Sequence, residues 1–515
     1  MLYKFVTLII LDGFGIAPPH EGNAVFRAKK PNFDNLVKYY PHSVLQAAGE
    51  EVGLPSFEMG NSEVGHMNLG AGRVMYQELP KIDKAIKKGS FFQNPAFLAA
   101  CNHAKKNNSK LHLIGLISEN GVHAHSRHLF ALLDLAKQQN LNKVFVHAFL
   151  DGRDSPRDAA KNFVANVEKK IKKVKLGKIA NLVGRFYAMD RNKNWDRIEK
   201  AYNLLVKGEG EQAKDSRKAI LESYKNQVFD EEFKPTLLNK DGLIENNDAV
   251  IFFNFRTDRA KQLTHAFVDE KFEGFPREKI KNLFFATMTE YDKGLPCDVA
   301  FPHEQVVNVL GEVISRAGLL QLRIAETEKY AHVTNFFNCQ NKEPYQGEDR
   351  ILIPSPKVIS YDQKPEMSAL EVTEKILPAI LSKKYSLIIL NFANPDMVGH
   401  TGNISAAIKG IEAMDVCLGK IVKTVFSQNG AVVICADHGN AEIMINLVTG
   451  EVDKEHSTSP VPLILAAPHL KLAMPSENTD LSVFSPCGVL SDVSPTVLKL
   501  LGISKPKEMT AISLY

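Results

Sequence analysis

Short apolar runs that stop abruptly at acidic, basic or imidazole side chains recur along the chain. These runs are Val6–Leu11, Leu111–Ile117, Val144–Leu150 and residues 179–183, 249–255, 386–390 and 431–436. Continuous aliphatic and β-branched runs of this length are typical of strands buried on both faces, as in parallel sheets. We therefore predict mainly parallel or mixed sheets built from these segments.

Helix-length segments separate the apolar runs. Residues 127–139, 159–173 and 368–381 carry apolar side chains at steps of three and four residues, which is the period of an amphipathic helix. Strands that alternate with such helices predict an α/β fold in which helices flank the sheets. Ligands of open α/β sheets bind beyond the carboxyl ends of the strands, where the polar residues of this sequence lie.

The polar residues at these strand ends differ between regions of the chain. Those near the two termini are mainly Asp and His: Asp12, Asp396, His400, Asp437 and His438. Those in the middle include many Arg: His123, Asp151, Arg153, Asp154, Arg185, Arg191, Arg256, Asp258 and Arg259. We predict a discontinuous metal-binding domain, residues 1–76 and 311–515, with an anion-binding domain, residues 77–310, inserted into it.

The composition is that of an ordinary globular protein. The chain has 515 residues, of which 63 are Lys or Arg and 59 are Asp or Glu, so its formal net charge is +4. This small excess gives no reason to expect nucleic acid or a membrane surface as a partner. The six cysteines are far apart and form no C-x-x-C pair, which indicates reduced thiols and a cytoplasmic location.

The Asp and His residues near the termini offer ligands for metal ions. Asp396 and His400 are four residues apart, Asp437 and His438 are adjacent, and His456 lies in Glu-His-Ser. Carboxylates and neutral imidazoles together suit divalent ions such as Mn²⁺ or Zn²⁺, and with Asp12 this set suffices for two ions. A single Asp-His pair is more often part of a loop or a helix cap, so the prediction depends on the recurrence.

The segment Gly60–His66, with sequence GNSEVGH, allows two interpretations. Ser62 or Asn61 could cap a helix by accepting a backbone N–H. Alternatively, Ser62 could be a nucleophile activated by a bound metal, with the helix N-terminus helping to hold a phosphoryl group.

The basic residues of the middle region indicate an anionic ligand. Arg153, Arg185, Arg191, Arg256 and Arg259, with Lys329 as a further candidate, could hold carboxylate or phosphate groups. Asp154 lies among these cations and could carry protons to and from a substrate hydroxyl. Any one of these arginines alone would be read as an ordinary surface residue.

Several motifs resemble those of the cofactor-independent phosphoglycerate mutases. They are LDGFG at 11–15, MGNSEVGH at 59–66, DGRD at 151–154, residues 391–400, ADHGN at 436–440 and residues 455–460. They follow the order of that family from Asp12 to His456. The resemblance therefore covers nearly the whole chain.

The resemblance implies a specific activity, fold and set of site residues. It implies an enzyme of glycolysis and gluconeogenesis that interconverts 3-phosphoglycerate and 2-phosphoglycerate through a phosphoserine at Ser62, without 2,3-bisphosphoglycerate. It further implies an alkaline-phosphatase-like core with an inserted transferase domain, and a monomer.

Two Mn²⁺ ions are implied, with Zn²⁺, Co²⁺ or Mg²⁺ as alternatives: Asp396, His400 and His456 would hold one, and Asp12, Ser62, Asp437 and His438 the other. The substrate-contacting set is His123, Arg153, Asp154, Arg185, Arg191, Arg256, Arg259 and Lys329, with Ser62, Asp154 and Lys329 as the catalytic residues.

Other functions are compatible with parts of the sequence. A metal-dependent phosphomonoesterase, a phosphopentomutase or a sulfatase-like hydrolase could use the same metal ligands. A phosphatase would not need so many arginines around a carboxylate, and residues 60–66 do not look like a sulfatase motif. A non-enzymatic metal- or anion-binding module would leave Ser62 and Asp154 without a role.

Overall fold

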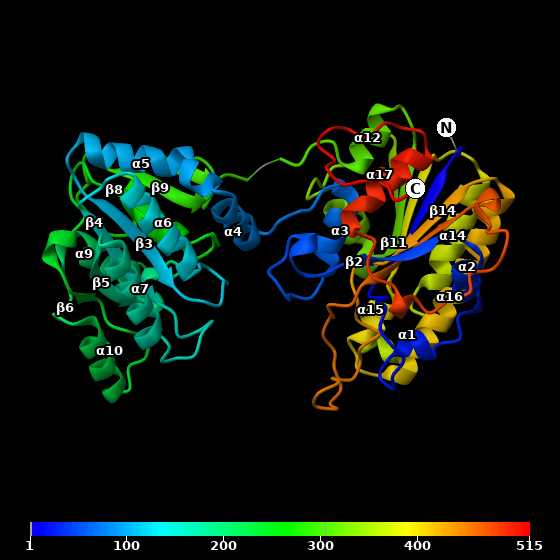
Figure 1. Cartoon of the computed structure of the whole chain (residues 1–515), viewed down its shortest axis with the longest axis horizontal. Coiled ribbons are helices and arrows are strands. Elements are labelled where there is room, and N and C mark those ends of the chain that lie inside the picture. Colours follow the sequence, from blue (N-terminus) through cyan, green and yellow to red (C-terminus); the bar gives the residue numbers. More distant parts are fainter. Residues whose placement is uncertain (1–2, 304) are drawn as a thin grey trace. The chain divides into compact units, whose positions relative to one another are not determined.

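The computed structural model describes residues 3–303 and 305–515, which divide into two compact units (Figure 1). Unit 1 is formed by the described residues up to Gln77 and from Gln305 onward, and unit 2 by those from Glu78 onward in between. Each unit has a separate hydrophobic core. The chain therefore enters and leaves unit 2 from within unit 1.

Unit 1 is built on a mixed sheet in which neighbouring strands run mainly parallel. Its order is β12 (Glu348–Ile353), β11 (Gln321–Glu326), β13 (Leu387–Phe392), β1 (Val6–Leu11), β14 (Ala431–Cys435), β15 (Val461–Ala466), β2 (His42–Gln46) and β16 (Gly488–Val489). Strand β15 runs antiparallel to both of its neighbours. Every residue of the central strand β1 is buried, as its uniformly apolar sequence predicts for a strand covered on both faces.

Helices pack in two groups around this sheet (Figure 1). One group contains α1 (Ala24–Arg27), α2 (Pro31–Tyr39), α14 (Ala369–Leu381), α15 (Asn394–Gly399) and α16 (Ile404–Ser427). The other contains α3 (Ser62–Ala71), α12 (Leu310–Arg316) and α17 (Val493–Leu500). The short helix α13 (Thr327–Ala331) follows directly on strand β11.

Unit 2 has a second mixed sheet with the same preference for parallel neighbours. Its order is β10 (Asp298–Phe301), β9 (Phe284–Thr289), β8 (Ala249–Phe252), β3 (Leu111–Ile117), β4 (Val144–Leu150), β5 (Lys178–Gly184), β7 (Thr236–Leu237) and β6 (Glu211–Gln212). Strands β5 and β7 are antiparallel. The remaining pairs are parallel.

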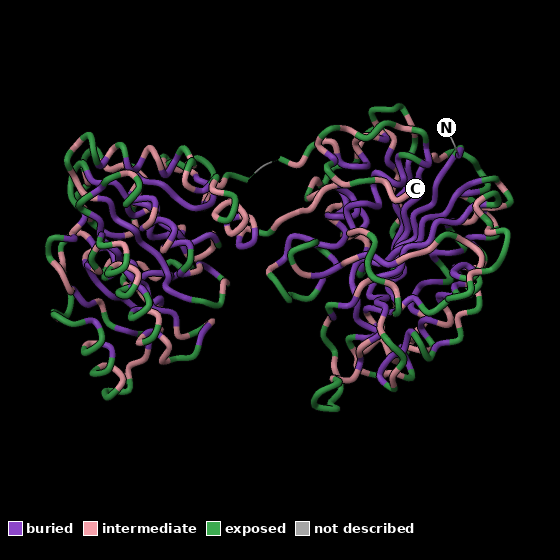
Figure 2. Tube along the Cα trace, viewed as in Figure 1, coloured by how far each residue is buried: buried purple, intermediate pink, exposed green. Residues whose placement is uncertain are grey.

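The helices of unit 2 alternate with its strands along the chain. They are α4 (Glu78–Lys88), α5 (Pro95–Lys106), α6 (Ser126–Gln138), α7 (Ala160–Val174), α8 (Arg185–Ala188), α9 (Trp195–Lys207), α10 (Ser216–Lys225) and α11 (Lys261–Val268). Two mixed, mostly parallel sheets flanked by helices confirm the predicted α/β class. Figure 2 shows the central strands of both sheets as the buried interior of each unit.

The predicted strand bounds agree with the structure for β1, β3 and β4, whereas β8 ends three residues before its predicted end. The apolar run 249–255 predicts a strand of that length, but β8 ends at Phe252. The Asn254 side chain accepts a hydrogen bond from the backbone N–H of Leu116 at 2.9 Å, in place of a continued backbone ladder. The hydrophobicity of residues 249–255 alone does not predict that a side chain replaces the backbone as the hydrogen-bond partner of Leu116.

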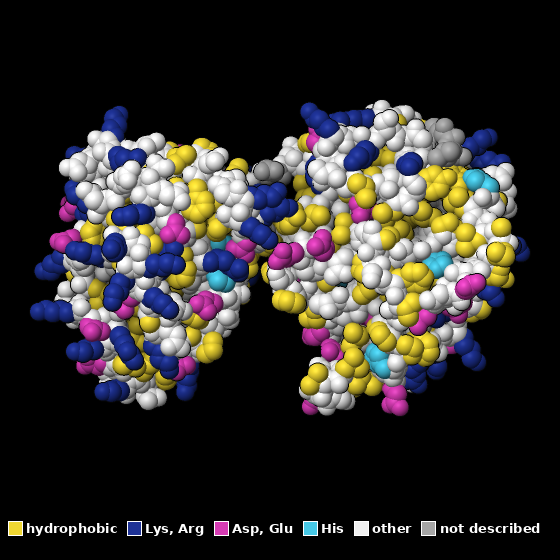
Figure 3. All heavy atoms as spheres, in the orientation of Figure 1, with side chains coloured by type: hydrophobic (Ala, Val, Ile, Leu, Met, Phe, Trp, Pro, Cys, Tyr) yellow, Lys and Arg dark blue, Asp and Glu magenta, His cyan; other side chains and the backbone are white. Residues whose placement is uncertain are grey.

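The surface of unit 2 carries many basic side chains. Lysines and arginines are scattered over the face visible in Figure 3, interspersed with acidic and neutral residues. Such interspersed charge is typical of a solvated surface. Across residues 3–303 and 305–515, we find no helix with the length and apolar character needed to cross a bilayer.

Candidate active site

Helix α3 begins in a way that leaves the Ser62 hydroxyl available. The N-cap is Asn61, whose Oδ1 accepts the backbone N–H of Val64 at 2.9 Å. Ser62 is therefore the first helical residue, and its hydroxyl is not the capping group. Gly60 allows the close approach of this segment to the site, because a Cβ there would lie 2.8 Å from the Cβ of His438.

The Ser62 hydroxyl lies among side chains that follow three other strands. Its Oγ is 2.8 Å from the Nζ of Lys329, 2.9 Å from the Nε2 of His438 and 3.3 Å from the Oδ1 of Asp12. The Lys329 Nζ also contacts the Oδ1 of Asp12 at 2.7 Å and the Oδ2 of Asp396 at 2.6 Å. Strand order explains this gathering: β11, β13, β1 and β14 are adjacent and parallel, so their carboxyl ends meet at one sheet edge.

Asp396, His400 and His456 form a cluster with the geometry of a cation site. The Nε2 atoms of the two imidazoles are 3.0 Å apart, and they lie 3.3 and 3.2 Å from the Oδ1 of Asp396. The Nδ1 atoms face the backbone carbonyls of Lys454 at 2.7 Å and Gly60 at 2.8 Å. A carbonyl can only accept, so each Nδ1 carries a proton, and the neutral form of each imidazole would present the Nε2 lone pair toward a cation shared with the carboxylate. This arrangement fits a divalent cation.

A second set of potential ligands surrounds Asp437. Its Oδ1 accepts the backbone N–H groups of Gly13 at 3.3 Å and His438 at 3.1 Å. Its Oδ2 is buried without a geometrically satisfactory hydrogen-bond donor, and lies 3.5 Å from the Nε2 of His438. Asp12 and Asp396 also approach His438. A buried carboxylate oxygen that lacks a hydrogen-bond donor and lies beside an imidazole and two further carboxylates fits a second divalent cation.

The electrostatics of this cluster favour positive charge. Burial by itself would raise the pKa of Asp12, but the Lys329 ammonium and the hydrogen bond with His438 hold that pKa well below its usual range. Burial would likewise lower the pKa of Lys329, yet Asp12 and Asp396 raise it. Burial also opposes protonation of His438, but Asp437 and the other carboxylates raise its pKa to about 10. The site therefore stabilises cations against the cost of desolvation.

Unit 2 gathers a second set of predicted residues around Asp154. The Arg185 Nη1 is 2.6 Å from the Oδ1 of Asp151 and also donates to the Oδ2 of Asp154. The Nε2 of His123 lies 3.8 Å from that same Asp154 oxygen. Burial and the nearby Arg185 lower the pKa of His123 to about 4, so its imidazole is neutral near pH 7. Gly152 permits the tight turn between these residues, since its φ is +67°.

Asp258 connects the remaining members of the basic set. Its carboxylate contacts the Nη1 of Arg191 at 2.9 Å, the Nε of Arg256 at 3.3 Å and the Nδ1 of His123 at 3.6 Å. Burial and the charges of Arg185, Arg191 and Arg153 lower the pKa of Arg259. The positive charges of these arginines thus lie close enough to repel one another. A bound anion would reduce that repulsion, so the geometry favours anion binding.

The structure therefore brings the sequence-predicted residues into two groups. Unit 1 holds Asp12, Ser62, Lys329, Asp396, His400, Asp437, His438 and His456. Unit 2 holds His123, Arg153, Asp154, Arg185, Arg191, Arg256 and Arg259. Arg153 forms its ion pair outside the group around Asp154 and Asp258. Its Nη1 lies 3.7 Å from Glu231, and its side chain is 54% exposed.

Three buried residues that contact the predicted ligands received no role from the sequence. Asn440 donates to the Oδ1 of Asp396 at 2.9 Å, and Asn391 donates to the Oδ2 of Asp12 at 2.7 Å. His66 lies 3.1 Å from the Oδ2 of Asp437. All three belong to motifs that the sequence analysis quoted, but spacing alone does not separate a supporting residue from a ligand.

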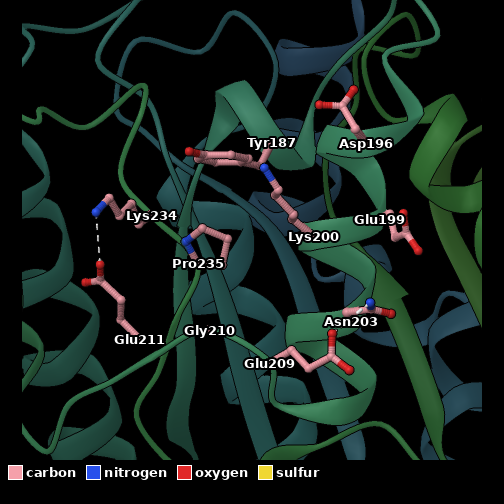
Figure 4. A pocket seen from close by; sticks show the side chains of 10 residues that line it. All are labelled: Tyr187, Asp196, Glu199, Lys200, Asn203, Glu209, Gly210, Glu211, Lys234 and Pro235. Carbon is pink, nitrogen blue, oxygen red and sulfur yellow. Dashed lines mark hydrogen bonds and ion pairs between the residues drawn. The ribbon is translucent and has the colours of Figure 1, made fainter.

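A cavity elsewhere in unit 2 is built from other residues. Its volume is about 650 Å³ and its lining is Tyr187, Asp196, Glu199, Lys200, Asn203, Glu209, Gly210, Glu211, Lys234 and Pro235. Figure 4 shows Lys234 paired with Glu211 on one side of it, at 3.3 Å. None of these lining residues belongs to the sequence-predicted site set.

Comparisons with known proteins agree with this architecture. The family model described as "BPG-independent PGAM N-terminus (iPGM_N)" matches residues 82–293. A 2,3-bisphosphoglycerate-independent phosphoglycerate mutase of Acetivibrio thermocellus is 53% identical over 99% of both chains, and one of Clostridium acetobutylicum is 52% identical over 100% of both. A crystal structure of Leishmania mexicana phosphoglycerate mutase at low cobalt concentration has 32% identity and a TM-score of 0.55, and covers 100% of this chain and 98% of that one.

A buried serine hydroxyl among carboxylates, imidazoles and an ammonium group suits an enzyme that transfers a phosphoryl group. Identity above 50% along the entire chain makes the assignment specific. The chain belongs to the family of 2,3-bisphosphoglycerate-independent phosphoglycerate mutases, which confirms the resemblance seen in its motifs.

Proposed function

We propose that this chain interconverts 3-phosphoglycerate and 2-phosphoglycerate, a step of glycolysis and gluconeogenesis, with Ser62 as the transient phosphoryl acceptor. The observation that carries the proposal is the position of the Ser62 hydroxyl, 2.8 Å from the Lys329 ammonium and 2.9 Å from the His438 imidazole. Because Asn61 caps the helix, this hydroxyl has no capping role. The relatives of more than 50% identity are named 2,3-bisphosphoglycerate-independent phosphoglycerate mutases, which supports this reaction.

The two ligand clusters of unit 1 would hold two divalent metal ions. Asp396, His400 and His456 would hold one, and Asp12, Ser62, Asp437 and His438 the other. When bound, such ions withdraw electron density from coordinated oxygens and lower the pKa of a coordinated hydroxyl. We propose Mn²⁺, with Zn²⁺, Co²⁺ and Mg²⁺ as alternatives, and unit 1 as the metal-binding phosphatase-like domain.

Ser62 and Lys329 would carry out the transfer from 3-phosphoglycerate. The Ser62 Oγ, whose proton would pass to solvent once a bound metal ion lowers the pKa of the hydroxyl, would form a bond to phosphorus as the bond between phosphorus and O3 of the substrate breaks. Lys329 would donate hydrogen bonds to the oxygens of the transferring group, where negative charge is concentrated. Asp154 would supply the proton that O3 needs as it leaves.

The residues of unit 2 would hold the glycerate while its two hydroxyls exchange roles. Arg153, Arg185 and Arg191 would bind its carboxylate through guanidinium groups, Arg256 and Arg259 would bind phosphate, and His123 would orient the reacting group. Asp154 would then take the proton of O2, which would form a bond to phosphorus as the bond between phosphorus and the Ser62 Oγ breaks. The phosphate returns to the same glycerate, so 2,3-bisphosphoglycerate is not needed.

The proposal is tested by following 3-phosphoglycerate in an assay without added 2,3-bisphosphoglycerate. Formation of 2-phosphoglycerate is the expected result, whereas release of free phosphate would identify a phosphomonoesterase instead. Ser62→Ala should abolish turnover and leave the fold intact. Normal turnover by that variant would rule out the phosphoserine route.

Ser216→Ala provides a matched control. Like Ser62, Ser216 is a buried serine at the first position of a helix whose N-cap is the preceding residue. Its hydroxyl donates to Glu168 at 2.5 Å, away from either group of predicted residues. This variant should keep full mutase activity.

We also propose that the enzyme is a cytoplasmic monomer. The six cysteines, all within the described part of the chain, are free thiols, which suits a reducing compartment. Light scattering coupled to size-exclusion chromatography should give the mass of a single chain of 57.3 kDa.

A further inference from the structure

His66 occupies a fully buried position on α3, one helical turn after Ser62. One nitrogen atom of its ring and carboxylate oxygens of Asp12 and Asp437 lie within 4.8 Å of one another, as the ligands of a metal ion would. A third cation site is therefore one interpretation of this cluster. The hydrogen bonds of the ring contradict it.

The hydrogen-bond partners of His66 determine where its proton lies. The Nδ1 atom is 2.9 Å from the backbone carbonyl of Ser62, which can only accept, so Nδ1 carries the hydrogen. The same nitrogen also lies 3.1 Å from the Oδ2 of Asp437, a close approach without the geometry of a hydrogen bond. The Nε2 atom is 3.2 Å from the amide nitrogen of Asn391, which can only donate. Both ring nitrogens are therefore occupied, and neither presents a free lone pair to a metal.

Asn391 extends this network to another carboxylate of the centre. Its amide nitrogen has two hydrogens, and its second partner is the Oδ2 of Asp12 at 2.7 Å. A single imidazole thus hydrogen-bonds to the Ser62 carbonyl on α3 and, through Asn391 on β13, to Asp12 after β1, and it lies in contact with Asp437 after β14.

We propose that His66 is a positioning residue that holds Asp437, Asp12 and the start of helix α3 in the geometry needed for metal binding and for attack by Ser62. This inference rests on the proposed function, because it takes Asp12 and Asp437 as metal ligands. Partners of this kind orient the ligating groups, and their loss typically lowers metal affinity or activity by about 10–100-fold.

Close packing allows little adjustment around this network. A Cβ on the neighbouring Gly65 would lie 2.5 Å from the backbone oxygen of Asp437. The His66 ring also packs against His332, with ring centroids 5.4 Å apart. A side chain that fills the same space without the hydrogen bonds therefore isolates their contribution from that of packing.

Three substitutions of His66 separate the two halves of the network. His66→Phe keeps a ring and removes both hydrogen bonds. His66→Asn can place an amide N–H where Nδ1 lies, which retains the contacts to Ser62 and Asp437. His66→Gln can place a carbonyl where Nε2 lies, which retains the acceptor for Asn391.

Asn68→Ala is the matched control on the same helix. Asn68 is fully buried and donates to the backbone carbonyls of Val52 and Val64, both at 2.9 Å. Its removal deletes buried hydrogen bonds of α3 without deleting a contact to Asp12 or Asp437. The variant should lose stability and keep the metal affinity and turnover of the wild type.

The full-length variants are titrated with Mn²⁺, and free Mn²⁺ is measured by its electron paramagnetic resonance signal. His66→Phe should bind Mn²⁺ about 10–100-fold more weakly and lower kcat more than it changes KM for 3-phosphoglycerate. His66→Asn and His66→Gln should each recover part of the affinity. The number of ions bound at saturation should stay that of the wild type.

Four results would overturn the inference. The first three concern Mn²⁺ affinity: wild-type affinity in His66→Phe, no recovery of affinity in His66→Asn or His66→Gln, or a loss of affinity in Asn68→Ala as large as that in His66→Phe. The fourth is the loss of one bound ion at saturation in His66→Phe, which would make His66 a metal ligand. A wild-type protein that binds no Mn²⁺ and forms no 2-phosphoglycerate would instead overturn the proposed function, and the inference with it. Wild-type turnover with an unaffected His66→Phe variant would overturn the positioning role alone.

Discussion

Lys329 contributes a buried positive charge to a cluster otherwise formed by carboxylates, imidazoles and a hydroxyl. Its ammonium contacts Asp12, Asp396 and Ser62 within 2.8 Å. A buried ammonium is stable only when paired and hydrogen-bonded, and the two carboxylates meet that requirement by raising its pKa. The same residue can therefore neutralise charge on a phosphoryl group without losing its own proton.

Replacing Lys329 by Met should lower kcat by about 10²–10³-fold, the usual effect of removing one donor that stabilises transition-state charge. The side chain keeps similar length and apolar volume, but Asp12 and Asp396 lose their ammonium partner, so the variant should also be less stable than the wild type. Steady-state kinetics with 3-phosphoglycerate measure the change. A kcat within a factor of two of the wild type would exclude the proposed role.

Glu326 predicts a distinct dependence of stability on pH. Burial raises the pKa of this carboxyl, at the end of β11, from 4.5 to about 7. Between those values the unfolded chain releases the proton that the folded chain retains, so stability falls as pH rises through this window. Above pH 7 the ionised group costs on the order of 3 kcal/mol of unfolding free energy.

Glu326→Gln removes this ionisation and should be more stable than the wild type at pH 8, with little difference at pH 5. Urea denaturation at the two pH values measures the effect. Glu328→Gln, two residues further and exposed, should show no such dependence. Equal destabilisation of Glu326→Gln at both values would contradict the interpretation.

At the scale of elements, a chain of buried polar groups crosses three strands of unit 2 and ends at the residue before a fourth. Asn181 on β5 donates to the Nδ1 of His147 on β4 at 2.8 Å, and the Nε2 of His147 is 2.9 Å from the Nδ1 of His112 on β3. The Nε2 of His112 is 3.0 Å from Asp248, just before β8. Asn181 must donate and Asp248 must accept, so both imidazoles are neutral and every nitrogen is used.

This chain predicts that unit 2 is sensitive to acid. Burial lowers the pKa of both His112 and His147, so in acid the unfolded chain binds protons that the folded chain excludes. Stability is retained above about pH 6.5 and is lost below it, by up to about 1.4 kcal/mol per pH unit for each imidazole. Hydrogen exchange of β3 and β4 amides between pH 7 and pH 5 should report this loss.

His103→Gln supplies the control for that measurement. His103 lies on α5 of the same unit and is partly exposed, with its Nε2 facing a backbone carbonyl. The variant should show the acid sensitivity of the wild type. If unit 2 keeps its full protection at pH 5, the neutral hydrogen-bonded chain is not what stabilises the strands.

At the scale of the molecule, the two units divide the proposed chemistry. The proposed metal ligands all lie in unit 1 and the arginines in unit 2. Each unit has its own sheet and core. Metal binding should therefore change the stability of the two units to different extents.

Removing divalent metal with a chelator should destabilise unit 1 selectively. A metal present at 100 times its Kd stabilises the unit that binds it by about 2.7 kcal/mol. Hydrogen exchange should show faster opening of β1, β13 and β14 after chelation, and little change in β3, β4 and β5. Equal changes in both sheets would contradict the assignment of both metal ions to unit 1.

The sequence by itself determined the features that depend on local composition. The bounds of β1, β3 and β4 follow from runs of apolar residues that are buried on both faces, and the residue types after each strand indicated metal and anion chemistry. The antiparallel strand β15 and the end of β8 did not follow, because they depend on partners distant in sequence. Spacing alone also left Asn61 and Ser62 as equal candidates for the helix cap.

Only the tertiary structure decided how the candidate residues relate to one another. It assigned the cap to Asn61 and placed Lys329 against residues more than 60 positions away along the chain. It also revealed the link from His66 through Asn391 to Asp12. The physical reason is that ligand geometry depends on which strand ends become neighbours at a sheet edge, and strand order is set by packing of the whole unit rather than by any local pattern.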